Sequence, residues 1–574
     1  MARPPLTRGV RFAALAGTML RRLLSFLLDA RHRAALREIW GKLASTEQPL
    51  LWLLAVVVGV ISGYAALGFY WTVQTLQEGL YGTTEARLET EAARLDWWVV
   101  LLVPTFGGII VGIILAVFSR SGRPASVAEV IEASRLHGGK MPLRRGIVAA
   151  AVSAVSLGCG ASSGREGPVV HLGATLAAQV SAWLNCSAIR GRTLLGCAAA
   201  AAVSSSFNAP IAGALFALEI VLGYYAVKAF APIVIASVAG ALVSRTHLGN
   251  YPAFFIPNHD LASFWELPAF ALLGVVCAIT ATLLMSTIIL ADQLTDSMKD
   301  RFDYPLWLEP AAGGVVLGLI ALVVPQTIGV GYETTTRVLY EQFEFWFIIL
   351  VIAAKMAAVA VTLATRFGGG VFSPSLMLGA LTGGAFGIVA TGIFPELGAS
   401  YGLYALAGMG AVAAAVLGAP ISTSLIVFEL TGDYQTAVAV MVSVSVASVM
   451  TQQVIERSYF HWRLGRRGLH LGDGPQRYLL DTMIVSHHMT PRGADGSPAE
   501  MQAWELIEQG VLLTEDDRLS KALPMFQQGR RLGYIPIVKQ TEGGGNTLTG
   551  VLFHVDALRA YNRALVEAHE EEHG

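Results

Sequence analysis

The feature that most constrains this chain is a predominantly apolar region that runs from about residue 50 to residue 450. Six stretches in it are long enough to span a bilayer, which takes about 20 apolar residues. Charged residues make up 14% of the whole chain, against about 25% in soluble domains. These properties exclude an ordinary soluble enzyme and predict an all-α polytopic membrane protein. The six predicted spans are 50–72, 98–118, 223–243, 267–290, 306–324 and 345–365.

Four further apolar stretches are interrupted by glycine and proline, at 147–172, 194–222, 374–393 and 403–449. Unwound backbone is tolerated at membrane depth only where protein buries it or where it lines a cavity. Broken helices of this kind are typical of transporters and channels, which aim half-helix ends at a central binding site.

The two ends of the chain are polar. Residues 1–48 carry nine basic residues and predict a cytosolic arm, partly an amphipathic helix, because cytoplasmic segments are enriched in lysine and arginine. Residues 466–574 predict a soluble domain with strands at 534–538 and 548–553, a Gly543–Gly545 turn and a terminal helix. The net charge of −1 does not favour nucleic-acid binding. The four cysteines lack paired spacing, and His487 and His488 look solvated, so no metal site or disulfide framework is expected.

Two of the interrupted regions repeat one pattern. A glycine stands four residues before a proline in Gly-Arg-Glu-Gly-Pro (164–168) and in Gly-Val-Phe-Ser-Pro (370–374). In each half an Ala-Pro pair follows, and a glutamate stands nine positions after that proline, at Glu219 and Glu429. Proline favours the first turn of a helix, and helix N-termini attract anions through free N–H groups and the helix dipole. The repeat therefore predicts two helix ends that bind one small anion between them.

With these motifs, together with Phe-Asn-Ala-Pro (207–210) and Phe-Glu-Leu-Thr-Gly-Asp-Tyr (428–434), the chain resembles the CLC family of chloride channels and chloride/proton antiporters. The resemblance implies an inverted-repeat fold with broken helices over residues 49–465, in halves of about 49–245 and 265–465. It also implies a homodimer with one chloride pathway per subunit, in the inner membrane of the cell, with both termini cytoplasmic.

The resemblance assigns Glu166 as the gate, a carboxylate that competes with the anion until it is protonated. The alternative is a structural ion pair with Arg165. An intramembrane acid is a functional candidate by default. The other positions that the resemblance places at the anion are Ala125, Ser126, Arg165, Gly167, Val371, Phe372, Tyr459 and Phe460.

Three positions depart from the family pattern. Ile220 stands where antiporters carry an internal proton-handling glutamate, directly after Glu219. The repeat mate of Glu219, Glu429, suggests a shared structural role at a buried helix end. The pore serine falls at Ala125, with Ser126 beside it, and the pore tyrosine falls at Phe460, with Tyr459 beside it. The expected function is a chloride channel, not an enzyme, with pH- or voltage-dependent gating by Glu166. The alternative is a chloride/proton antiporter with another internal proton path.

The soluble tail resembles one CBS motif from Val511 to Leu558, with only a fragment of a second at Met483–Thr490. A lone motif leaves an apolar face uncovered, which predicts pairing across the dimer. Asp556 stands where nucleotide-binding versions contact a ribose. A structural clamp is favoured over nucleotide binding, and no other cofactor is expected.

Overall fold

The computed structural model describes residues 48–573, except 120–121, 251–253, 255–263, 396–399, 456–457, 470–474, 494–499, 529–531 and 541–545. The predicted N-terminal arm and the glycine turn at 543–545 therefore lie outside the described residues. Seven described helices are long and apolar enough to cross a membrane. Large apolar side chains stand exposed along them, among them Phe106, Leu283 and Trp346. An apolar exterior of this kind is what a bilayer solvates, so the chain is an integral multi-pass membrane protein.

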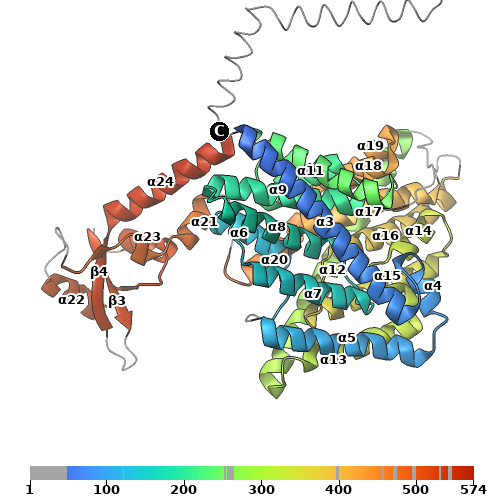
Figure 1. The fold of residues 1–574 in the computed structure, drawn as a ribbon, viewed down its shortest axis with the longest axis horizontal. Coiled ribbons are helices and arrows are strands. Elements are labelled where there is room, and N and C mark those ends of the chain that lie inside the picture. The colour runs from blue at the N-terminus through green and yellow to red at the C-terminus, as the bar shows by residue number, and fades with distance from the viewer. Residues whose placement is uncertain are drawn as a thin grey trace, which may run out of the picture. The chain divides into compact units, whose positions relative to one another are not determined.

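Figure 1 draws the helices of the first half in blue to green, among them α8, which begins within the motif at 164–168. All six predicted spans are helical, but the helices at 50–72 and 267–290 run on to Tyr81 and Phe302. The helix at 306–324 has 16 residues and is shorter than the seven spanning helices. In the first half the elements are α3 (Gln48–Tyr81), η1 (Glu85–Arg87), α4 (Leu88–Ala92), α5 (Trp97–Phe118), α6 (Val127–Leu136), α7 (Leu143–Gly158), α8 (Glu166–Trp183), α9 (Ala188–Phe207), α10 (Pro210–Phe216), the π-helical turn η2 (Ala217–Leu222) and α11 (Val227–Leu248).

The second half repeats this order of helices around the motif at 370–374. Its elements are η3 (Phe264–Glu266), α12 (Leu267–Phe302), α13 (Leu308–Val323), η4 (Pro325–Thr327), α14 (Tyr332–Leu339), α15 (Phe345–Ala364), α16 (Phe372–Ile393), α17 (Tyr401–Leu417), α18 (Pro420–Thr431), α19 (Tyr434–Val454) and α20 (Tyr459–Gly465).

The interruptions occur where glycine and proline predict them. Helix α9 ends at Asn208 and α17 ends at Gly418, both in the left-handed conformation with φ of 59° and 72°. In each case an alanine and a proline follow, and the proline begins the next helix, α10 or α18. A left-handed residue at a helix C-terminus and proline at the next N-terminus are the usual stop and start signals. The sequence repeat is thus a repeat of helix breaks.

Small residues let the central helices pack closely. Helices α16 and α17 cross where Gly379 and Gly408 face each other, and a Cβ on Gly379 would stand 2.3 Å from the carbonyl oxygen of Gly408. A side chain at either position would force the backbones apart. Close backbone approach through glycine and alanine is the common way in which helices associate without a hydrophobic driving force. The two helices hold the second motif rigidly at the start of α16.

The soluble region forms a four-stranded sheet in the order β1-β4-β3-β2. Strands β3 (Tyr534–Gln540) and β4 (Asn546–Phe553) are antiparallel and confirm the two predicted strands. The short strand β1 (Thr490–Pro491) pairs with β4, and β2 (Leu513–Thr514) runs parallel to β3. The helices of this region are α21 (Pro475–Thr482), η6 (Val485–His487), α22 (Glu500–Glu508), α23 (Leu519–Gln528) and α24 (His554–His573).

The upstream fragment at 483–490 belongs to this same sheet and its core. Val485 is fully buried with Leu513, Ile535 and Ile537, and Thr490 pairs with Val551. Strand β1 lies at the end of this fragment and β2 lies within the CBS-like stretch, and the sequence analysis predicts neither strand. Two-residue strands are too short to produce a visible alternation of apolar and polar residues.

Candidate functional site

The two motifs meet in space. Gly164 and Gly370 form an isolated antiparallel bridge, in which each N–H donates to the other's carbonyl at 2.7 and 2.8 Å. Helix α8 begins two residues after Gly164, and α16 begins two residues after Gly370. The two helix N-termini therefore start from one shared bridge, although more than 200 residues separate them in the sequence.

Each of these helix starts has backbone N–H groups that find no acceptor within the helix. The first four N–H groups of a helix have no intrahelical acceptor, and Pro168 and Pro374 hold the third position of their helices. Because proline lacks an N–H, the donors lie in the two residues before it: Glu166 and Gly167 in one helix, and Phe372 and Ser373 in the other. The prediction that both loops lead into helix N-termini is confirmed, and such ends favour negative charge.

Glu166 supplies a negative charge at this place. Its side chain is 1% exposed, and Oε1 accepts hydrogen bonds from Ser373 Oγ at 2.6 Å and Tyr332 Oη at 3.2 Å. Ser373 belongs to the first turn of α16. The carboxylate of the first motif thus lies at the helix start of the second motif.

Arg165 is held away from Glu166. Its guanidinium pairs with the buried carboxylate of Glu85 at 3.0 Å, whereas its Nε lies 4.0 Å from Glu166 Oε1. The rings of Tyr70 and Tyr332 lie on it, with centroids at 5.0 and 4.9 Å. Burial raises the pKa of the Glu85 carboxyl, and Arg165 opposes this rise. The principal ion pair of Arg165 is therefore with Glu85, which disfavours the interpretation of Glu166 as a purely structural partner of Arg165.

A narrow cavity, here called the gate cavity, lies in front of Glu166. Its volume is about 10 Å³, roughly the room that a single water needs. The ring of Phe372 forms one wall and packs on Phe207 and Phe216 with centroids 5.0 and 5.8 Å apart. The lining residues are Ser126, Val127, Glu166, Gly167, Val170, Phe216, Leu363, Gly369, Gly370, Val371, Phe372, Tyr459, Phe460 and Arg463. The sequence leaves open whether Tyr459 or Phe460 holds the pore position, and both residues line the gate cavity.

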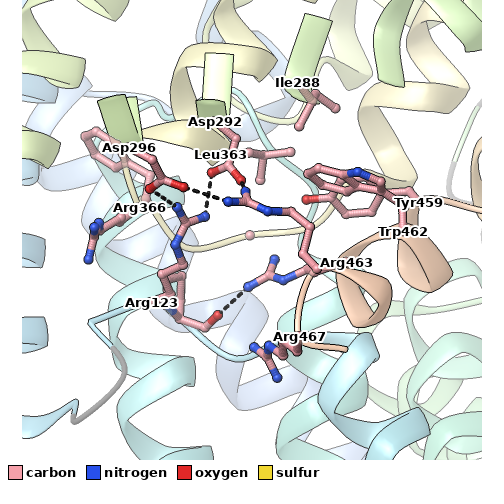
Figure 2. A pocket seen from close by; sticks show the side chains of 14 residues that line it. Arg123, Ile288, Asp292, Asp296, Leu363, Arg366, Tyr459, Trp462, Arg463 and Arg467 are labelled. Carbon is pink, nitrogen blue, oxygen red and sulfur yellow. Dashed lines mark hydrogen bonds and ion pairs between the residues drawn. The ribbon is translucent and has the colours of Figure 1, made fainter. Parts of the chain in front are cut away.

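A second cavity of about 230 Å³, here called the arginine cavity, adjoins the gate cavity. Figure 2 shows Arg123, Arg463 and Arg467 around it, with Asp292 and Asp296 of α12 opposite. Four residues line both cavities and are here called the neck: Leu363, Gly369, Tyr459 and Arg463. The sequence analysis did not identify Arg463, whose position one turn after Tyr459 in a basic segment gives only a weak signal.

Three expected anion contacts are bound to other groups or lie outside the gate cavity. Ser126 caps α6: its Oγ and N–H both donate to Glu129 Oε2, at 3.0 and 2.6 Å. This capping box engages the Ser126 hydroxyl, which is the hydroxyl next to the position of the family's pore serine. Ala125 lines a separate cavity and not the gate cavity. Arg165 is likewise outside the gate cavity, because its guanidinium is bound to Glu85.

Glu219 and Glu429 form a reciprocal pair of helix caps. Glu219 accepts from the N–H groups of Ile421 and Ser422 at 3.0 and 2.8 Å, at the start of α18. Glu429, on α18, accepts from those of Ile211 and Ala212 at 3.0 and 2.7 Å, at the start of α10. This confirms the predicted structural role at a helix end. The neighbouring Ile220 is buried and has no titratable group.

Comparisons with known proteins agree with this architecture. The family described as voltage gated chloride channel matches residues 107–452. A ClcB-like chloride channel protein of Ralstonia nicotianae is 32% identical over 395 residues, which cover 68% of this chain and 91% of that protein.

Two solved structures have the same fold. The structure of a slow cyanobacterial chloride/proton antiporter superposes with a TM-score of 0.64 at 20% identity, over 73% of this chain and 97% of that one. A CLC-type fluoride/proton antiporter gives 0.61 at 22% identity, over 72% and 97%. Proteins of this family are channels or transporters and not enzymes. On the family match, the relative and the shared fold, the chain belongs to the CLC family, the voltage-gated chloride channels and their transporter relatives.

Proposed function

We propose that this chain is a chloride channel in which Glu166 gates a passive anion pathway through the gate cavity. The observation that carries the proposal is the place of the Glu166 carboxylate. It is bound to Ser373 in the first turn of α16, where two helix N-termini favour a negative charge. A carboxylate in this position competes with a permeant anion for the same donors.

Protonation of Glu166 provides the switch. A neutral carboxyl group loses the charge-assisted part of its hydrogen bonds, which are roughly twice as strong as neutral ones. The side chain then leaves the helix ends, and chloride takes its place. Binding by backbone N–H groups and dipoles is weak enough to let the anion leave again, as conduction requires. Acidification on the side from which Glu166 takes its proton therefore increases the chloride flux.

Proton coupling is disfavoured by position 220. Isoleucine cannot exchange a proton, and Glu219 beside it is committed to the start of α18. The test is to reconstitute the protein in vesicles with a chloride gradient and to record chloride and proton movement together. Chloride movement without a coupled proton flux supports the channel. Protons driven uphill at a fixed ratio to chloride would refute it.

The second candidate function is chloride/proton exchange, which the two antiporters of similar fold favour. It needs a buried titratable group in place of the missing glutamate. His171 of α8 is such a group: it is 2% exposed, and its Nδ1 has no hydrogen-bond partner among the described residues. Its charged neighbours are Glu129 and Arg463. Loss of proton transport, but not of chloride transport, in His171→Gln would support this second function.

The remaining expectations belong to the same proposal. The protein is a homodimer with one pathway per subunit, in the inner membrane with both termini in the cytoplasm. The soluble region acts as a CBS-like clamp across the dimer. Asp556, the candidate nucleotide contact, lies in the first turn of α24 and pairs with Arg559 at 3.4 Å. Cross-linking in native membranes tests the dimer, and protease access from each side tests the orientation.

A further inference from the structure

The neck between the gate cavity and the arginine cavity contains one charged side chain among its four residues, Arg463. The others are Leu363, Gly369 and Tyr459. An ion that moves from one cavity to the other along these shared residues meets the side chain of Arg463. This full positive charge adds to the helix dipoles that the sequence repeat predicts, and it lies at a different point of the pathway.

The other arginines that line the arginine cavity are neutralised by carboxylates. Arg123 and Arg466 share Asp292 and Asp296, with Arg123 at 2.9 Å and Arg466 at 2.6 Å from Asp296. Arg366 pairs with Glu309 at 2.8 Å, and Arg467 pairs with Glu129 and Glu132. These pairs fix the cavity wall and leave it little net charge.

Arg463 differs from them in its partners. Among the described residues its guanidinium donates to a neutral group, the carbonyl oxygen of Pro124 at 2.9 Å. Glu129 acts on its charge, but that carboxylate already accepts from Ser126 and Arg467. A guanidinium has five N–H donors, so this one hydrogen bond does not exhaust it. Tyr459 lines the same two cavities as Arg463, and its hydroxyl also has a proton to donate.

We propose that Arg463 and the hydroxyl of Tyr459 form an anion-binding site at the neck, which takes a small monovalent anion as it moves between the two cavities. This inference rests on the proposed function. The family pattern has hydroxyl groups at the positions of Ala125 and Phe460, and this sequence lacks both. The proposed site has the full charge of Arg463 and the hydroxyl of Tyr459 in their place. The other arginines of the arginine cavity form ion pairs that fix its wall. The charge of Arg463, which binds the anion, takes no part in those pairs.

The test is radioactive chloride exchange across vesicles at a series of symmetrical chloride concentrations. Arg463→Gln keeps the length and polarity of the side chain and removes its charge. The chloride concentration for half-maximal exchange should rise at least tenfold, the effect of losing one charge-assisted hydrogen bond. Arg463→Lys should raise this concentration less. The matched control is Arg466→Gln, which removes an ion-paired arginine of the same cavity and leaves Arg123 on Asp292 and Asp296; it should stay within about twofold of the natural chain.

A cysteine variant separates charge from folding. Arg463→Cys is purified, reconstituted and then treated with a thiol reagent that attaches either an ammonium or a sulfonate group. Restored chloride affinity with the ammonium alone supports the site, and the natural chain treated with the same two reagents controls for its four own cysteines. Equal behaviour of both products, or an unchanged concentration dependence in Arg463→Gln, overturns it. If the natural chain itself carries no chloride, the proposed function fails instead.

Discussion

The two halves of the membrane region use one backbone device but place different side chains on it. In each half a glycine bridge leads into a helix whose third residue is proline. In the first half the position that begins the helix is Glu166, and in the second half it is Phe372. In the proposed function the shared backbone supplies the anion site, and the difference between Glu166 and Phe372 at the first position of the two helices supplies the switch. A symmetrical pair of glutamates would place two negative charges where one anion must bind.

The largest expected effect is the loss of the switch in Glu166→Gln. Glutamine cannot change its charge, so chloride flux should no longer respond to external pH, whereas the natural chain conducts more as the pH falls. The measurement is vesicle flux over a range of external pH. Phe372→Leu, at the equivalent position of the other half, is the matched control and should keep its pH response. A pH response that survives in Glu166→Gln would remove Glu166 from the gate.

A smaller effect is expected from removing the hydrogen bond by which Ser373, in the second half, holds the side chain of Glu166. Ser373 Oγ donates to Glu166 at 2.6 Å, and a hydrogen bond to a charged group contributes about 1.5–3 kcal/mol. Ser373→Ala should therefore raise chloride flux at neutral pH by about tenfold. Tyr332→Phe removes a longer bond of 3.2 Å and should raise it less. If Ser373→Ala conducts like the natural chain, this contact does not hold the gate closed.

A third prediction tests whether the two halves are equivalent away from the gate. Glu219 and Glu429 each cap the helix of the other half. Replacing either by alanine should lower stability by about 1–2 kcal/mol, as for other helix caps. Thermal unfolding in detergent should show similar falls in melting temperature for Glu219→Ala and Glu429→Ala. A fall confined to one variant would show that the repeat is not functionally symmetrical here.

The smallest expected effect belongs to Ile220→Glu. This variant adds a carboxyl group at the position where antiporters of the family carry one. We expect no fixed ratio of protons to chloride, because a complete path also needs partners that relay the proton. Simultaneous recording of both ions checks this. Stoichiometric exchange in Ile220→Glu would mean that the rest of the proton path is already present.

Much of the fold follows from the sequence because its signals are local. The spans are predicted by apolar length, and the breaks by glycine, asparagine and proline at helix ends. The meeting of residues 164–168 with 370–374 could be predicted only from the repeat, which indicates that two similar segments serve one site. The role of Glu219 could also be predicted, since its repeat mate Glu429 argues against a role peculiar to one half.

The neck could not be predicted, for physical reasons. The position of Arg463 beside both cavities depends on how α20 meets the loop at Pro124, a contact between residues 339 positions apart. A basic residue near the end of a membrane helix has a common alternative, in which it faces the polar boundary. The capping of α6 by Ser126 likewise decides which hydroxyl is free, and the type of residue alone does not reveal this.

The most direct test of the central claim is to locate the anion. Bromide scatters anomalously and can replace chloride in crystals of the natural chain and of Glu166→Gln. We predict a bromide peak between the starts of α8 and α16 in Glu166→Gln, within hydrogen-bond distance of their backbone N–H groups and at the place of the natural carboxylate. A site left without bromide in the variant, or bromide bound far from both helix starts, would contradict the account.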